Sequence, residues 1–110
     1  MSETLKVLGQ SAPAATTDTN IYTVPASRAT VVSSLTVCNR GAAAGTFRVA
    51  VRPAGAVIAT AHYIYFDAPL AAKATLAATL GLTLATTDVV TVRASSADFS
   101  FHLYGAEVVV

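Results

Sequence analysis

The sequence predicts an all-β protein, a single antiparallel β-sandwich of jelly-roll or immunoglobulin-like type, with about seven to eight strands and an extended N-terminal arm. Strand signals recur about every ten to fifteen residues and are separated by short segments rich in Gly, Pro, Ala, Asp and Asn. Helix signals are weak. The 110 residues fit one domain that buries a core without disulfide bonds. We expect residues 1–20 to form an arm or first strand and residues 21–110 to form the sandwich domain.

The clearest strand is Thr46–Arg52, in which apolar side chains alternate with Arg48, Ala50 and Arg52. Successive side chains of a strand point to opposite faces, so one face belongs to the core and the other carries two arginines. The same alternation predicts a strand in Asp88–Ala94.

The last strand is predicted in Phe99–Val110, where Phe99, Phe101 and Leu103 alternate with polar or amphipathic side chains. Gly105 interrupts this pattern and predicts a bulge or bend before the apolar C-terminal residues.

Another strand is predicted in Thr30–Asn39, which is rich in β-branched residues. Simple alternation places Val31, Leu35 and Val37 on one face and Val32 on the other.

The segment Asn39–Gly45 is typical of a hairpin loop. Further along, His62–Phe66 predicts an aromatic strand in which Tyr63 and Tyr65 share one side, and Asp67–Pro69 is expected to end it.

The segment Ala71–Leu84 is ambiguous, because its alanines suit a helix by propensity. Its threonines and Gly81 favour a strand with a bend, which is the interpretation adopted here.

The N-terminal segment offers two alternatives. Leu5, Val7 and Leu8 can form a short strand, and Ser11–Asn20 is a connector of small residues and threonines. The segment either adds a strand to an adjacent subunit or supplies the first strand of its own domain.

The composition limits the classes of function. Apolar residues make up 54% of the chain and charged residues 12%, about half the usual share, so we expect partner proteins to cover part of the surface. The net charge of +1 is spread over scattered residues, which argues against nucleic-acid binding. No apolar run approaches the ~20 residues of a membrane span. The N-terminus has no secretory pattern, and the single Cys38 suits assembly in a reducing cytoplasm.

No sequence motif indicates catalysis or a cofactor. The chain has no nucleophile elbow, HExxH motif, phosphate-binding glycine loop or paired-cysteine motif. Cys38, His62 and His102 are chemically suited to zinc, but they lie on separate strands of unknown register and lack a fourth ligand. Cys38 with His102 could form a nucleophile pair, but no helix N-terminus or cationic cluster is present to activate the thiol. We therefore predict a protein that is not an enzyme and has no metal or cofactor.

Two groups of side chains are candidates for interaction besides Leu5, Val7 and Leu8. Arg48 and Arg52 lie on the outer face of their strand, where they are either solvated or paired with an acidic neighbour. Tyr63 and Tyr65 could form a sugar-binding platform or a subunit contact, or pack in the core with their hydroxyls at the edge.

A resemblance to a known family adds to this interpretation. Ile21–Ala26 (IYTVPA) and Val32–Gly41 (VSSLTVCNRG) resemble the YTVPA…V..L.V.N.G opening of small bacteriophage structural proteins. Segments 47–55, 63–67 and 81–92 are similar to the succeeding strands of that family, so the resemblance covers about residues 5–108.

The resemblance implies a non-enzymatic virion component, assembled in the host cytoplasm and bound to other phage structural proteins of the capsid, neck or tail. The first expectation is a capsid decoration or accessory protein that forms homo-oligomers. The alternative is a tail or fibre-attachment module that recognises a host surface glycan.

Overall fold

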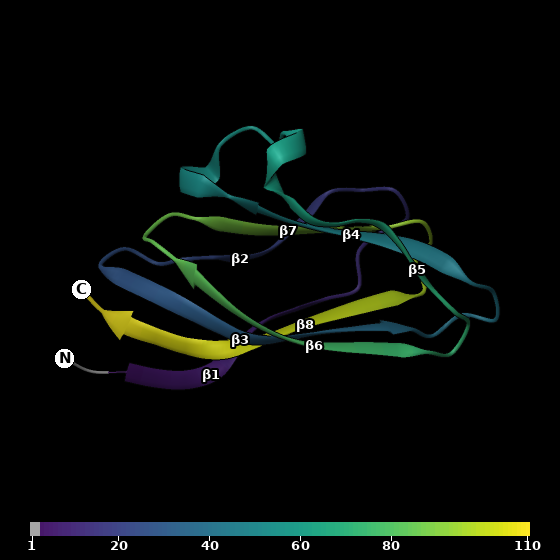
Figure 1. Ribbon diagram of the computed structural model, residues 1–110, viewed down its shortest axis with the longest axis horizontal. Coiled ribbons are helices and arrows are strands. Elements are labelled where there is room, and N and C mark those ends of the chain that lie inside the picture. The colour runs from purple at the N-terminus through teal and green to yellow at the C-terminus, as the bar shows by residue number, and fades with distance from the viewer. Residues whose placement is uncertain (1–2) are drawn as a thin grey trace.

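Eight strands form two four-stranded antiparallel sheets that pack face to face in the computed structural model, which describes residues 3–110 (Figure 1). Two 3-10 turns interrupt the connection between the fourth and fifth strands. The elements are β1 (Glu3–Ser11), β2 (Thr19–Thr23), β3 (Arg28–Asn39), β4 (Gly45–Arg52), η1 (Pro53–Gly55), η2 (Thr60–His62), β5 (Tyr63–Leu70), β6 (Thr75–Leu84), β7 (Val89–Ala94) and β8 (Phe99–Val109). The predicted all-β sandwich is confirmed.

The strand order identifies the sandwich as a jelly roll. One sheet has the order β1-β8-β3-β6 and the other the order β2-β7-β4-β5. An immunoglobulin-like fold would instead pair the first strand with the second, whereas here the first strand pairs with the last. Apart from β4 and β5, neighbouring strands of each sheet are thus distant in the sequence.

The core lies between the two sheets and consists of the inward side chains of both. Phe47 is at its centre, with ring centroids 5.4 Å from Tyr65, 6.4 Å from Phe99 and 6.2 Å from Phe101. The predicted inward set of β8, Phe99, Phe101 and Leu103, is fully buried. Burial of aromatic and branched side chains from both sheets supplies the main stabilising term of this fold.

A bulge in β3 overturns the predicted faces of that strand. The register shifts between Val32 and Ser34, where Ser33 is an extra residue relative to β8. Val32 therefore points into the core with Leu35, and Val31 is exposed. Strict alternation over the whole strand was wrong because a bulge reverses the side-chain pattern on one side of it.

Gly105 of β8 lies opposite this bulge. A Cβ atom at Gly105 would stand 2.0 Å from the backbone oxygen of Val31, far inside van der Waals contact. Glycine allows β3 and β8 to approach closely here. The bulge or bend predicted at Gly105 therefore exists, but it lies in the neighbouring strand β3.

Residues 3–11 form a strand of their own domain. β1 pairs with β8 from Glu3 to Ser11, and residues 12–18 then cross to the other sheet. Of the two alternatives for the N-terminal segment, the structure has pairing within the domain and not an extended arm.

The loop at residues 40–44 is not a hairpin loop. It joins β3 of one sheet to β4 of the other. Asn39 organises it, since its side-chain amide donates to the backbone oxygens of Ala43 and Leu70 and its oxygen accepts from the backbone N–H of Gly41. The sequence alone could not tell a crossing between sheets from a hairpin.

The ambiguous segment Ala71–Leu84 contains a strand, as predicted. β6 pairs with β3, and Gly81 adopts a positive φ of 68° where the register shifts. β5, in contrast, is longer than predicted, because it continues past Asp67 and Pro69 to Leu70. Asp67, with φ 50°, forms a bulge that the strand passes through.

Candidate interaction surfaces

The outer face of the β1-β8-β3-β6 sheet carries almost no charge, and we call it the low-charge face. Paired residues of antiparallel strands share a face, so the register defines its members. Among the strand residues that the structure describes, Glu3 is its single formally charged side chain. The others are apolar, hydroxyl-bearing or uncharged, and include Leu5, Val7, Gln10, Val31, Ser34, Thr36, Cys38, Thr75, Ala77, Thr79, Thr83, His102, Tyr104 and Ala106.

An apolar row crosses this face. Leu5 of β1 pairs with Ala106 of β8, which pairs with Val31 of β3. Leu5 is 79% exposed and Val31 40% exposed, and Val7 beside them is 48% exposed. Leu8, by contrast, belongs to the core, so the predicted interaction set Leu5, Val7 and Leu8 divides between surface and interior.

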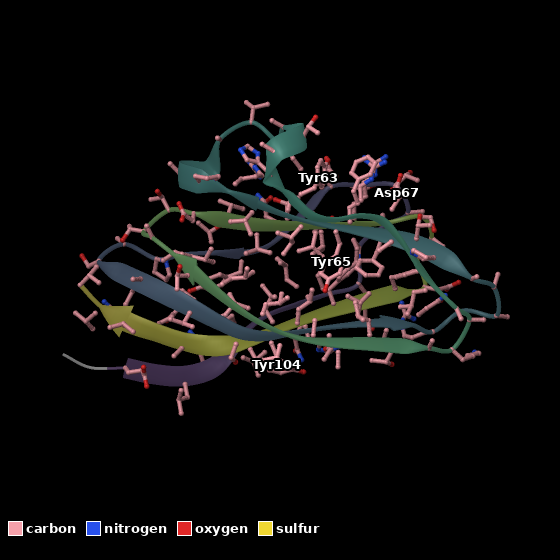
Figure 2. All side chains as sticks on the ribbon, viewed as in Figure 1. Tyr63, Tyr65, Asp67 and Tyr104 are labelled. Atoms are coloured by element: carbon pink, nitrogen blue, oxygen red, sulfur yellow. The ribbon has the colours of Figure 1, made fainter. Side chains whose placement is uncertain are left out.

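A shallow groove of about 370 Å³ lies along the apolar row. Its lining combines Leu5, Val31, Tyr104 and Ala106 with Ser33, Gly105 and two charged residues of β1, Glu3 and Lys6. Figure 2 shows Tyr104 on the outside of this sheet. A groove that combines apolar side chains and a tyrosine with one charge of each sign at its β1 side is the kind of surface that packs against another protein.

The edge of the low-charge face at β6 is also uncharged. β6 has ten residues, TLAATLGLTL, without a charged residue or proline. Charged residues and prolines usually protect the edge strands of monomers from pairing with another chain, and β6 has neither. The edge strand β5 of the other sheet carries Asp67, Pro69 and two register shifts.

The outer face of the β2-β7-β4-β5 sheet carries arginines, and we call it the charged face. Arg48 of β4 pairs directly with Arg93 of β7. Two like charges opposite each other are unfavourable unless they are neutralised. Arg48 Nε lies 2.7 Å from Asp67 Oδ1, and Arg93 Nη1 lies 3.6 Å from Asp18 Oδ1. Of the two alternatives for Arg48, solvation or pairing with an acidic neighbour, the structure has the ion pair, and the neighbour belongs to the same chain.

Arg48 and Asp67 form a two-point ion pair. Nε and Nη2 of the guanidinium donate to the two carboxylate oxygens at 2.7 and 3.2 Å. These hydrogen bonds lower the pKa of Asp67 and raise that of Arg48. Both groups are thus held in their charged forms.

Tyr63 and Tyr65 do not share a side, contrary to the prediction. Tyr63 pairs with Ala50 and Tyr65 with Val49, so the register shift between them reverses the pattern. Figure 2 shows Tyr65 pointing into the sandwich and Tyr63 outside. Tyr65 packs against the core.

Phe66, and not Tyr65 as predicted, lies beside Tyr63 on the outer side of β5. The rings of Tyr63 and Phe66 meet edge to face at 4.9 Å, and the guanidinium of Arg48 lies 4.2 Å from the Phe66 ring centre. Phe66 is 58% exposed. Tyr63, Phe66 and Arg48 thus form one group on the charged face, in which Phe66 is exposed and the other two are half-buried.

Arg52 has a structural role in the connection after β4. Its guanidinium donates to the backbone oxygens of Gly55 and Ala56 and to the side chains of Asn20 and Thr91. It holds the turn η1 against β2 and β7. Of the two predicted arginines, Arg48 is the one that borders a surface depression.

A buried polar group joins the two sheets beneath these faces. The hydroxyl of Tyr22 on β2 donates to Glu107 on β8 at 2.6 Å and lies 2.7 Å from the hydroxyl of Thr30 on β3. Lys6 completes the group 3.4 Å from Glu107. Burial and this hydrogen bond raise the pKa of Tyr22 to about 12, and the hydrogen bond from Tyr22 lowers the pKa of Glu107.

The residues considered for metal or nucleophilic chemistry are distributed over different elements. Cys38 lies on β3 opposite Ser100, and His102 is hydrogen-bonded to the side chain of Gln10 at 3.2 Å. His62 lies in η2, beside β4 of the other sheet. Within residues 3–110, no three His, Cys, Asp or Glu side chains gather at a metal-binding distance. No helix in this part of the chain is long and apolar enough to cross a membrane.

Comparisons with protein-family models, with curated proteins and with solved structures found no match to the chain.

The surface residues that sequence reasoning missed are Val31, Tyr104, Phe66 and Asp67. Bulges placed Val31 and Phe66 on the outside, and alternation alone cannot locate a bulge. The sequence predicts for Asp67 only that it ends a strand. An acidic residue next to an aromatic run and nineteen positions after Arg48 gives no sequence signal of a cross-strand ion pair.

Proposed function

We propose that the chain is a non-enzymatic virion structural protein of a bacteriophage, which packs against neighbouring subunits of the particle through its low-charge face. The observation that carries this proposal is the scarcity of charge on that face, with Leu5, Val7 and Val31 exposed on it. An isolated domain gains solubility from surface charges, whereas a face covered by a partner does not need them. The resemblance of the sequence to small phage structural proteins supports the same role.

The partners proposed are other phage structural proteins and further copies of this chain, with the virion as location and the host cytoplasm as the place of assembly. The apolar row and groove would supply the buried centre of the contact, and the surrounding threonines and serines its rim. A capsid decoration or accessory protein is the first choice within this class. The bound state gains stability from the area that docking removes from water.

Copy number tests this proposal. Quantitative mass spectrometry of purified particles from the phage that encodes the chain should find it as a stoichiometric component, and light scattering of the purified chain should give a mass above that of one copy. Many copies per capsid indicate decoration, and a dozen or fewer indicate the neck or tail. A chain that is monomeric and absent from washed particles would contradict the proposal.

Truncation at Asn20 does not separate docking from folding, since residues 3–11 pair with β8 and include the core residue Leu8. Single substitutions of exposed residues on the low-charge face are the sharper test, because they leave the core intact.

A second candidate function is attachment to a host glycan by a tail or fibre-attachment module. The observation that favours it is the group of Tyr63, Phe66 and Arg48 on the charged face, with Phe66 exposed. Its test is sugar binding by the isolated chain.

A further inference from the structure

The charged face contains a second depression, of about 270 Å³, beside the exposed aromatic group. Three strands and the connector before β2 contribute to it. Its polar lining residues are Thr16, Thr46, Arg48, Asp67, Arg93 and Ser95. Its volume is near the lower end of the range of small-molecule sites, which suits a single sugar ring.

The charges around this depression balance. Arg48 and Arg93 lie opposite each other, and each has one carboxylate partner, Asp67 and Asp18 respectively. The sum is zero. A multiply charged anion would meet two arginines but also the Asp67 carboxylate at the same place, so the site favours a neutral ligand.

Donors and acceptors stand side by side in the depression. A guanidinium has five N–H donors, and Arg48 uses Nε and Nη2 toward Asp67, which leaves donors free. The Asp67 carboxylate has further acceptor positions, because its side chain is 48% exposed. Neighbouring hydroxyl groups of a sugar each donate and accept one hydrogen bond, and an Arg–Asp pair serves both needs.

An apolar rim adjoins this polar pair. Phe66 is more than half exposed, and Arg48 is shared between the ring of Phe66 and the carboxylate of Asp67. A pyranose ring has a C–H face and a rim of hydroxyl groups. The site offers Phe66 for the C–H face of the sugar and the Arg48–Asp67 pair for its hydroxyl groups.

The backbone that holds the polar pair is unusual. Asp67 and Thr16, both at this depression, have positive φ angles of 50° and 54°. Positive φ is uncommon for residues other than glycine and is most unfavourable for a β-branched one such as Thr16. The bulge at Asp67 places its carboxylate on Arg48 and turns Phe66 outward. Such local strain is often found at binding sites.

From these features we infer that the depression lined by Arg48 and Asp67, together with Phe66, which packs on Arg48 beside it, binds a neutral pyranose of a cell-surface glycan. Arg48 donates to one sugar hydroxyl, Asp67 accepts from the next, and Phe66 packs against the C–H face of the ring. This inference rests on the second candidate function and names its ligand class and residues. It does not depend on docking through the low-charge face.

The test is a titration of the full-length ¹⁵N-labelled chain with the methyl pyranosides of glucose, galactose and mannose, followed by NMR. Binding of at least one of them, with a dissociation constant in the millimolar range, should shift the amide signals of Thr46, Arg48, Asp67 and Ser95. Asp67→Asn should weaken binding about tenfold, as expected for loss of one charge-assisted hydrogen bond. Thr79→Ala, on the low-charge face, is the matched control and should bind as the parent does.

Three results would overturn the inference: no shift with any of the three sugars, shifts confined to the low-charge face, or tighter binding of glucuronate or sulfate than of the neutral sugars. Phe66→Ser provides a second variant if Asp67→Asn disturbs the bulge. An unchanged spectrum away from Phe66, together with lost sugar binding, supports the inference. The titration uses the isolated chain, so a lack of sugar binding says nothing against docking to the particle. A lack of docking, in turn, says nothing against the sugar site.

Discussion

The two outer faces of the sandwich differ in charge although they belong to one small domain. On the charged face, Arg48, Arg52 and Arg93 are each bonded to partners of the same chain. On the low-charge face, Glu3 is the single charged strand residue of the described chain, and apolar side chains are exposed. The charged residues, 12% of the sequence, are therefore unevenly distributed in space. The share of charged residues is low for the whole chain and much lower for the low-charge face.

The largest expected effect of a single change is in the sheet behind the low-charge face, at Gly105, which pairs with the core residue Val32. Gly105→Ala should lower the free energy of unfolding by about 3 kcal/mol, because the added methyl group meets the backbone of Val31 and must push β3 and β8 apart. Equilibrium unfolding in guanidinium chloride measures this.

Gly81→Ala is the control for Gly105→Ala. A Cβ at Gly81 meets nothing within 4 Å, but its φ of 68° costs about 1 kcal/mol for a residue with a side chain. Equal stability of Gly105→Ala and the parent would contradict the close approach of the two strands.

The buried polar group that joins the two sheets, centred on Tyr22 and Glu107, should give the next largest effect. Tyr22→Phe removes the hydroxyl that bonds Glu107 and Thr30, and should cost about 1–3 kcal/mol because it leaves Glu107 buried with a partner fewer. Thermal unfolding at neutral pH tests this. Tyr104→Phe on the exposed low-charge face is the control and should leave the melting temperature nearly unchanged.

The same group predicts how stability depends on pH. The pKa of Glu107 is lower in the folded chain than its ordinary value of 4.5, so its contribution is complete above that pH and is lost as the pH falls through the folded value. The pKa of Tyr22 is raised from 10.0 to about 12, so its contribution is complete below pH 10.0 and is lost as the pH rises toward 12.

Unfolding measured from pH 3 to 11 should therefore show a stability plateau between about 5 and 10. In Glu107→Gln the acid side of this plateau should become flatter. An acid limb of unchanged slope in that variant would show that other carboxylates dominate.

Much of the fold could be predicted from the sequence, since strand periodicity is strong in Thr46–Arg52 and in the first part of β8. The faces were harder to predict. Each error, at Val31, Tyr65 and Phe66, follows from a bulge that shifts the pattern by one residue. Bulges depend on pairing between distant strands, and one sequence read segment by segment does not contain that pairing.

The smallest effect is expected on the charged face. Asp67→Asn leaves Arg48 and Arg93 opposed without their closest carboxylate, so the melting temperature should fall slightly at low salt and recover at high salt. Asp18→Asn, whose ion pair is longer at 3.6 Å, should show a weaker salt dependence. A fall that persists in high salt would point to loss of the bulge geometry instead of charge repulsion.

The proposed division of roles between the faces is tested most directly by incorporation of tagged variants into particles of the phage proposed to encode the chain. Val31→Lys and Phe66→Lys each replace an exposed apolar residue by lysine, one on each face. Val31→Lys should reduce incorporation about tenfold or more, because docking would bury an unpaired charge, whereas Phe66→Lys should be incorporated like the parent chain. Normal incorporation of Val31→Lys together with loss of Phe66→Lys would contradict docking through the low-charge face.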